Sequence, residues 1–289
     1  MMDDLFAEQV TDVLGSGILD KMEARLGSDN VVQYYLTLGT DRIDMSALIG
    51  STVEIQYDQK IFCSHCGKQT SKSYQGLCYD HFMSLAQSDT CMMSPEKCHL
   101  AQGTCREPSW AENVCQQTHY VYLANSSDVK VGITRAGQLP VRWMDQGAKQ
   151  GLIIARVTSR YLSGVLEVVF KQHVADKTNW RTMLNSSNED IDLAEQRDKL
   201  FDLCADSLSE LEQQYGRQHI QLIRQGEVQE IVYPVTQYLE KISSMTFDKQ
   251  SQIGGKLLGI KGQYLILDQG VVNIRRHSGY QVKLFASVS

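Results

Sequence analysis

Two short runs decide the fold of the central part of the chain: Tyr120-Val121-Tyr122-Leu123 and Lys130-Val131-Gly132-Ile133-Thr134. Both runs are rich in aromatic and β-branched residues, which favour strands. The intervening Asn125-Ser126-Ser127-Asp128 is typical of a turn, so we predict a β-hairpin. Because Tyr120 and Tyr122 lie two residues apart, their side chains share one face of the first strand.

Two charged residues follow the hairpin in predicted helices. Pro140 suits the first turn of a helix, which places Arg142 where the helix dipole disfavours a cation. Ser163 is a candidate cap for a second helix, in which apolar residues surround Glu167. A buried carboxylate is costly unless it is paired or binds a cation. Arg142 is therefore either a solvated side chain or an anion ligand. Glu167 is either an ion-pair partner of Arg142 or Arg160, or a metal ligand.

The order and spacing of five residues resemble the GIY-YIG nuclease domain: Tyr122, Gly132, Arg142, Glu167 and Asn179. The resemblance implies a small antiparallel sheet with helices and a phosphodiesterase acting on DNA or RNA. In that family the tyrosine is the general base, the arginine binds the scissile phosphate and the glutamate holds a divalent metal, usually magnesium. These roles fall on Tyr122, Arg142 and Glu167, and Asn179 matches a supporting asparagine. Such groups suit phosphodiester cleavage, which needs an activated water and charge stabilisation.

The chain departs from the family motif at two positions. Tyr120 stands where the first motif has glycine, and Lys130 stands where the second has a tyrosine, although phage-type branches carry a similar lysine. Lys130 can lower the pKa of a neighbouring tyrosine or hold a phosphate, so we count it among the catalytic candidates. His173 is either a further member of the site or a structural residue. A nuclease fold without activity stays open.

Seven of the eight cysteines lie between Cys63 and Cys115. The first group combines the knuckle Cys63-Ser64-His65-Cys66-Gly67 with the pair Cys78-Tyr79-Asp80-His81. Two such pairs are typical of a structural zinc site. We therefore predict zinc ligands at Cys63, Cys66, Cys78 and His81, with His65 as a competing ligand.

The second group fits no common zinc-finger spacing and consists of Cys91, Cys98, Cys105 and Cys115. Because this segment is rich in turn residues and poor in apolar ones, we predict that a second zinc cross-links it. His99 can replace one cysteine, and the alternative is four reduced, packed thiols. Closed sets of four protein ligands are structural rather than catalytic. Cys204 stands alone, and we predict that it is a core residue.

The 289 residues predict a multidomain α+β protein. Its predicted parts are an N-terminal β-unit (1–62), a zinc-binding segment (63–117), the GIY-YIG-like domain (118–188), an acidic helical segment (189–230) and a C-terminal β-unit (231–289). The strand patterns of the two terminal units are alike, which suggests that they pack together as one barrel or sheet. The acidic start and the lack of a long apolar segment predict a cytoplasmic protein without membrane contact.

Charge is unevenly distributed along the chain. The net charge is −6, yet basic residues outnumber acidic ones within 119–188, which favours a local phosphate-binding surface. Three functions are compatible with these patterns: a magnesium-dependent phosphodiesterase, a zinc-containing nucleic-acid-binding protein that does not cut, or a protein-interaction scaffold using the acidic helices. The arrangement also resembles an uncharacterised bacterial family that places a cysteine-rich segment before stretches like 130–135 and 142–148.

Overall fold

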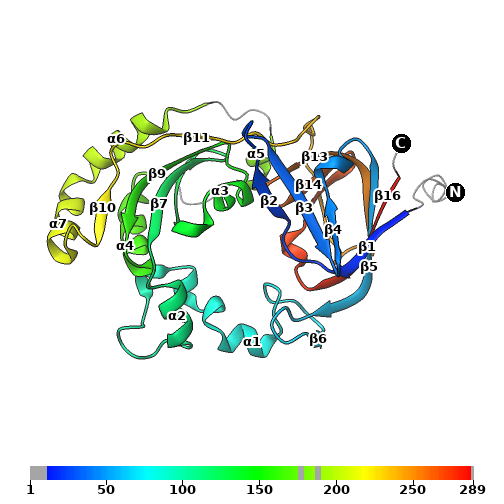
Figure 1. Cartoon of the computed structure of the whole chain (residues 1–289), viewed down its shortest axis with the longest axis horizontal. Coiled ribbons are helices and arrows are strands. Elements are labelled where there is room, and N and C mark those ends of the chain that lie inside the picture. Colours follow the sequence, from blue (N-terminus) through cyan, green and yellow to red (C-terminus); the bar gives the residue numbers. More distant parts are fainter. Residues whose placement is uncertain (1–11, 175–178, 186–189, 288–289) are drawn as a thin grey trace. The chain divides into compact units, whose positions relative to one another are not determined.

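The computed structural model describes residues 12–174, 179–185 and 190–287, and it combines helices with antiparallel sheets (Figure 1). The predicted α+β class is therefore confirmed. The chain forms two compact units. Unit 1 comprises Met1–Phe82, Leu184–Ser186 and Val232–Ser289, and unit 2 comprises Met83–Met183 and Ser187–Ile231. No helix in the described part of the chain is long and apolar enough to cross a membrane.

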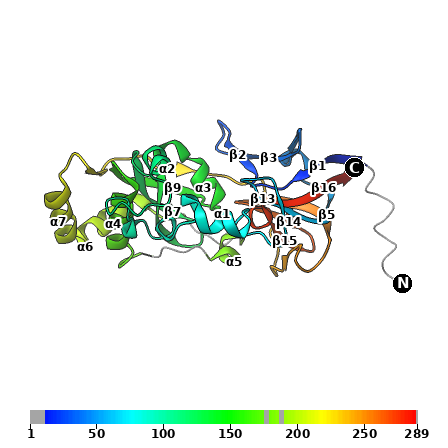
Figure 2. The same cartoon turned by 90° about the horizontal axis from the view of Figure 1, so that it is seen from below.

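Strands from both ends of the chain build the main sheet of unit 1. In spatial order they are β1 (Asp12–Ile18), β16 (Tyr280–Ser287), β5 (Thr52–Phe62), β13 (Gln252–Lys261), β14 (Tyr264–Leu267), β15 (Gly270–Asn273) and β12 (Ser244–Met245), with β6 (Gln69–Thr70) paired to β5. Neighbouring strands run antiparallel except β12 and β15. Figure 2 shows β1, β16 and β5 side by side from below. The two terminal segments thus share one sheet.

A smaller sheet and short helices complete unit 1. The sheet consists of β2 (Glu23–Leu26), β3 (Val32–Leu38) and β4 (Asp41–Asp44), in that order. Buried and exposed residues alternate along β3, as expected for a strand with one face on the core. The helical elements are η1 (Ser46–Leu48), η6 (Arg275–His277) and the start of α1 (Tyr79–Ser84).

Unit 2 is built on a sheet that contains the predicted hairpin, with β7 inside the sheet and β8 at its edge. The order is β10 (Ile220–Leu222), β9 (Gln150–Val157), β7 (His119–Asn125) and β8 (Val129–Arg135), and β11 (Gln229–Glu230) also pairs with β9. β7 and β8 are antiparallel, and Tyr122 lies opposite Gly132. The helical elements are α2 (Pro108–Val114), α3 (Val141–Asp145), α4 (Arg160–Phe170), α5 (Trp180–Met183), α6 (Leu193–Leu203), α7 (Ala205–Tyr215), η2 (Ala86–Ser88), η3 (Thr90–Met92), η4 (Pro95–Lys97) and η5 (Ala136–Gln138).

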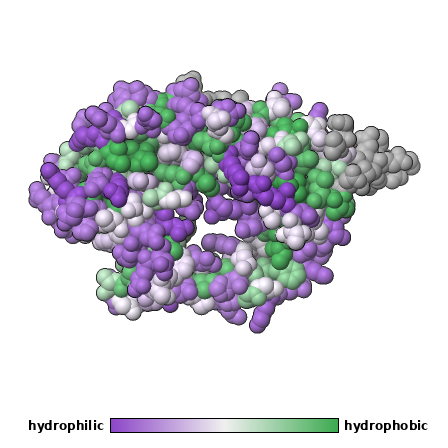
Figure 3. All heavy atoms as spheres, viewed as in Figure 1, coloured by the Kyte–Doolittle hydropathy of each residue, from purple (hydrophilic) through white to green (hydrophobic). Residues whose placement is uncertain are grey.

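Helices α4 and α6 cover the apolar face of this sheet. Leu166 and Phe170 of α4 and Phe201 of α6 join Val121 and Leu123 of β7 in one buried cluster. Each such side chain contributes about 1.5–3 kcal/mol by leaving water. Cys204 belongs to the same cluster, so its prediction as a core residue is confirmed. Hydrophilic side chains cover α7, at the left of Figure 3, so its charges face solvent.

One local prediction was wrong and another was incomplete. The cap of α4 is Ser159, whose hydroxyl accepts from the Leu162 amide, whereas Ser163 lies inside the helix and donates to the Arg160 carbonyl. The helix begins earlier than predicted because Ser159 already supplies a capping oxygen. The segment 189–230 contains α6 and α7 but also β10 and β11. These strands, of three and two residues, are too short to show a period of their own.

Candidate functional sites

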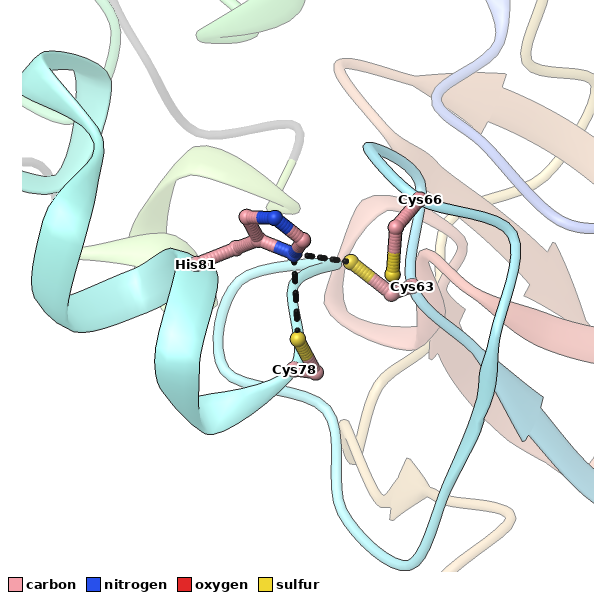
Figure 4. A group of neighbouring side chains, drawn as sticks. All are labelled: Cys63, Cys66, Cys78 and His81. Carbon is pink, nitrogen blue, oxygen red and sulfur yellow. Dashed lines mark hydrogen bonds between the residues drawn. The ribbon is translucent and has the colours of Figure 1, made fainter.

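Four predicted zinc ligands meet in unit 1. Cys63, Cys66, Cys78 and His81 point toward one another (Figure 4), and their ligand atoms all lie within 4.8 Å of one another. The His81 Nδ1 lies 3.2 Å from the Cys78 sulfur and 3.6 Å from the Cys63 sulfur. Atoms bound tetrahedrally to one zinc are about 3.6 Å apart for sulfur and nitrogen. The donor set therefore fits a zinc ion.

The local sequence positions these ligands. Cys63 directly follows the long strand β5, and Gly67 turns the chain back at φ +69°, where its amide donates to the Cys63 carbonyl at 2.8 Å. His81 lies in α1, which begins directly after Cys78. The His65 ring stacks 4.4 Å from the His81 ring but is not part of the four-ligand group. Four protein ligands leave no open position, so zinc bound here is structural.

The Cys63 thiol loses its proton more readily than an ordinary cysteine thiol. Burial raises the pKa of Cys63, but backbone hydrogen bonds around the knuckle and a hydrogen bond with His81 outweigh it and lower the pKa to about 6. The thiolate is the form that binds zinc. Hydrogen bonds that stabilise this form reduce the cost of releasing the proton when the metal binds.

The second cysteine group in unit 2 is looser. Its tightest metal-capable group is Asp89, Cys91 and His99, whose ligand atoms lie within 4.8 Å of one another. Burial raises the pKa of Cys91 to about 11, with smaller contributions from Asp89 and from the thiols of Cys98, Cys115 and Cys105. These three thiols lie outside the group of Asp89, Cys91 and His99. A second zinc therefore stays a prediction.

A polar cluster in unit 2 brings several catalytic candidates together. The Tyr122 hydroxyl donates to Gln146 Oε1 at 3.0 Å, and Arg142 and Glu167 both shift the pKa of this phenol. The Tyr122 ring lies edge-on to Trp143, with centroids 5.9 Å apart. Gly132 makes room for this ring, since a Cβ there would lie 2.6 Å from the phenol oxygen.

Burial controls the titration of this cluster. Tyr122 is fully buried, and burial raises its pKa although Arg142 acts in the opposite direction. Lys130 is 4% exposed, and burial together with the charge of Arg142 lowers its pKa to about 8. In the free protein at neutral pH, Tyr122 is therefore a protonated phenol, whereas Lys130 loses its proton more readily than an exposed lysine.

Glu167 is a buried carboxylate, as its sequence neighbours suggested. It is 9% exposed in α4, and its Oε2 lies 3.3 Å from the ammonium group of Lys171 one turn later. The carboxylate also favours the charged form of Arg160. The ion-pair alternative from the sequence is thus present, with Lys171 as a partner that the sequence argument did not name.

Two other candidates have structural explanations. Asn179 Oδ1 accepts from the amides of Arg181 and Thr182 at 3.1 and 3.3 Å, so this exposed side chain caps the start of α5. His173 is exposed at the end of α4. Neither Asn179 nor His173 is among the residues that shift the pKa of Tyr122.

Sequence reasoning missed a cavity of about 670 Å³ in unit 2. Its lining includes Cys98, Tyr161, Tyr215 and His219 and does not include Tyr122, Arg142 or Glu167. These lining residues come from the cysteine-rich loop, α4, α7 and the start of β10, and no motif connects them in the sequence. The residues of the polar cluster therefore do not line this cavity.

Comparison with known proteins identifies a family. Residues 50–282 match the model of a family described as "Protein of unknown function (DUF2797)". Because the match covers most of the chain, the chain belongs to this family. No curated protein and no solved structure matches the chain significantly. The family description assigns no activity, so the function has to be argued from the residues.

Proposed function

We propose that unit 2 hydrolyses phosphodiester bonds of nucleic acid with a divalent cation at the cluster of Tyr122, Lys130, Arg142 and Glu167. One observation carries the proposal: Arg142 and Glu167, from two different helices, both lie close enough to Tyr122 for their charges to shift the pKa of its phenol. The GIY-YIG resemblance, which is built on the same residues, supports it. The excess of basic residues in 119–188 also favours a phosphate-bearing substrate.

Each side chain has a chemical role in this proposal. Arg142 is partly exposed and binds the scissile phosphate as a planar cation with several donors. The Glu167 carboxylate is the protein ligand for magnesium, which keeps several waters of its own. Magnesium held by Glu167 would activate a water and stabilise negative charge on the leaving oxygen.

The proton-transfer roles differ from those of the family motif. Tyr122 is a hydrogen-bond donor in the free protein, because burial keeps its phenol protonated. With a pKa of about 8, Lys130 accepts a proton more readily near neutral pH than the phenol does. The lysine in the second motif is thus compatible with catalysis, and it takes over the role of base.

Binding without cleavage is the second candidate function. The complete burial of Tyr122 favours it, since a phosphodiester cannot reach the phenol unless the cluster opens. Arg142, partly exposed at the same cluster, would then contact phosphates alone. Binding of this kind weakens steeply with salt.

A nuclease screen separates the two functions. Labelled single- and double-stranded DNA and RNA are incubated with magnesium and the full chain, its Glu167→Gln variant and its Glu210→Gln variant. Glu210 is an exposed carboxylate of α7, so Glu210→Gln is the matched control. We expect cleavage by the wild type and the control and at least about a 100-fold lower rate for Glu167→Gln, because charge stabilisation in the transition state is lost.

The remaining outcomes are equally informative. Equal cleavage by wild type and Glu167→Gln indicates a contaminating nuclease and refutes the site. Salt-dependent binding without cleavage selects the second function. Absence of both binding and cleavage for every substrate refutes both proposals. A pH–rate profile tests whether Lys130 is the base. Activity should fall below about pH 8, where Lys130 becomes protonated, and this pH dependence should change in Lys130→Arg.

A further inference from the structure

Arg160 has a buried donor that lacks a hydrogen-bond partner. Arg160 begins α4; its Nη2 donates to the Met92 carbonyl at 2.6 Å, and its backbone amide donates to the Cys115 carbonyl at 2.7 Å. Its Nε is buried and has no partner. Arginine remains charged in proteins, and a buried donor without a hydrogen-bond partner is destabilising. This position therefore calls for an anion beside Nε.

The neighbours of Arg160 indicate which anion belongs there. The thiols of Cys115 and Cys91 and the carboxylate of Glu167 favour the charged guanidinium. Geometry also brings Cys98 and Cys105 here, since a ring nitrogen of His99, the residue after Cys98, lies within 4.8 Å of the Cys91 sulfur, and His99 Nδ1 lies 2.9 Å from the hydroxyl of Thr104, the residue before Cys105. The four cysteines thus lie around the guanidinium of Arg160. As long as their thiols are protonated, they supply no negative charge to it.

The competing ligands of this neighbourhood already have partners. The Asp89 Oδ2 pairs with Arg106 at 2.9 Å, and its Oδ1 lies 3.4 Å from His99 Nε2 and accepts from the Cys91 amide. The other ring nitrogen of His99 lies 2.9 Å from the Thr104 hydroxyl. Asp89 and His99 therefore shape the loop around Cys91, while Cys98, Cys105 and Cys115 are the ligands available to join it.

We propose that Cys91, Cys98, Cys105 and Cys115 bind a second structural zinc ion and that Arg160 donates its Nε–H to a coordinated sulfur. On binding, the four thiols release four protons to solvent, and the zinc–thiolate group carries a net charge of −2. The guanidinium then has a charged acceptor and offsets part of that charge. Hydrogen bonds to metal ligands of this kind commonly change metal affinity 10- to 100-fold.

The zinc site is attached to the helix that carries Glu167. Gly164 of α4 packs against η4 so closely that a Cβ there would lie 2.6 Å from the Glu96 amide nitrogen. Arg160 holds the start of the same helix against Met92 and Cys115. Arg160 is thus a positioning residue, and the second zinc fixes α4 whether or not the polar cluster hydrolyses a substrate.

Metal counting in the full chain tests this proposal. Native mass spectrometry of the wild type should show two zinc ions, Cys105→Ser should show one, and His99→Gln should still show two. Arg160→Gln should release one zinc to a competing chelator about tenfold faster or more. The other zinc, at Cys63, Cys66, Cys78 and His81, should leave at the wild-type rate and serves as the internal control.

Several results would overturn the proposal. One zinc in the wild type removes the second site, and this measurement needs no variant to fold. Loss of a zinc in His99→Gln assigns a mixed ligand set instead. If Cys105→Ser does not fold, cobalt is substituted for zinc in the wild type and its absorption spectrum is measured. The proposal requires two cobalt sites, one with Cys₃His ligands and one with four thiolates. Unchanged zinc release from Arg160→Gln excludes the role of the guanidinium.

Discussion

Replacing Gly132 with alanine tests the contact on which the polar cluster depends. The added Cβ would lie 2.6 Å from Cζ and Oη of Tyr122 and 2.8 Å from Cε2. The ring is held by Trp143 and by the hydrogen bond to Gln146, so it cannot move away freely. Overpacking of this kind costs about 1–3 kcal/mol, and loss of the hydrogen bond adds about 1 kcal/mol. Removing a strand glycine returns about 0.5–1 kcal/mol. We expect Gly132→Ala to lower the free energy of unfolding by about 2–3 kcal/mol.

Urea unfolding followed by tryptophan fluorescence measures this change. All three tryptophans, Trp110, Trp143 and Trp180, belong to unit 2, so their emission reports on the unit that contains Gly132. Gly137→Ala is the matched control, because its Cβ would meet no atom within 4 Å. If Gly132→Ala unfolds at the same urea concentration as Gly137→Ala, the phenol does not lie over Gly132 and the cluster geometry is wrong. A double variant with Tyr122→Leu should recover part of the loss, since contacting residues are not additive.

Three further predictions concern metal, pH and a helix cap. Cys78→Ser should remove one zinc ion and lower the thermal stability of unit 1, measured by elemental analysis and calorimetry; retention of the metal would exclude Cys78 as a ligand. Burial lowers the pKa of His119 to about 4, so the folded state binds fewer protons than the unfolded state between pH 4 and 6.5. Stability should fall by up to about 3 kcal/mol as the pH drops through this window, and His119→Phe should flatten the slope in urea titrations. Asn179→Ala should cost about 1 kcal/mol as a lost cap, whereas Asn179→Asp should retain the cap; a much larger effect of Asn179→Ala on cleavage than on unfolding would return Asn179 to the catalytic site.

The sequence predicted best where local chemistry is specific. The knuckle at Cys63, the pair ending in His81 and the hairpin of β7 and β8 follow from spacing and residue type, and the structure places them as expected. The partners of individual polar side chains were harder to predict. The partner of Glu167 is Lys171, and the asparagine at position 179 has a local capping role. The strands β10 and β11 exist only because β9 offers them a pairing edge.

Burial explains why motif residues alone do not determine the chemistry of this cluster. Tyr122 and Lys130 occupy motif positions that sequence can identify, but their protonation depends on how much water the packed unit excludes. The same exclusion raises the pKa of the phenol and lowers that of the ammonium group, because burial always disfavours the charged form. Lys130 therefore reaches its neutral amine form, which can accept a proton, at a lower pH than an exposed lysine, while Tyr122 stays a phenol. Both pKa shifts have burial as their first cause, and the activity assay with Lys130→Arg tests whether the proposed base depends on the shift at Lys130.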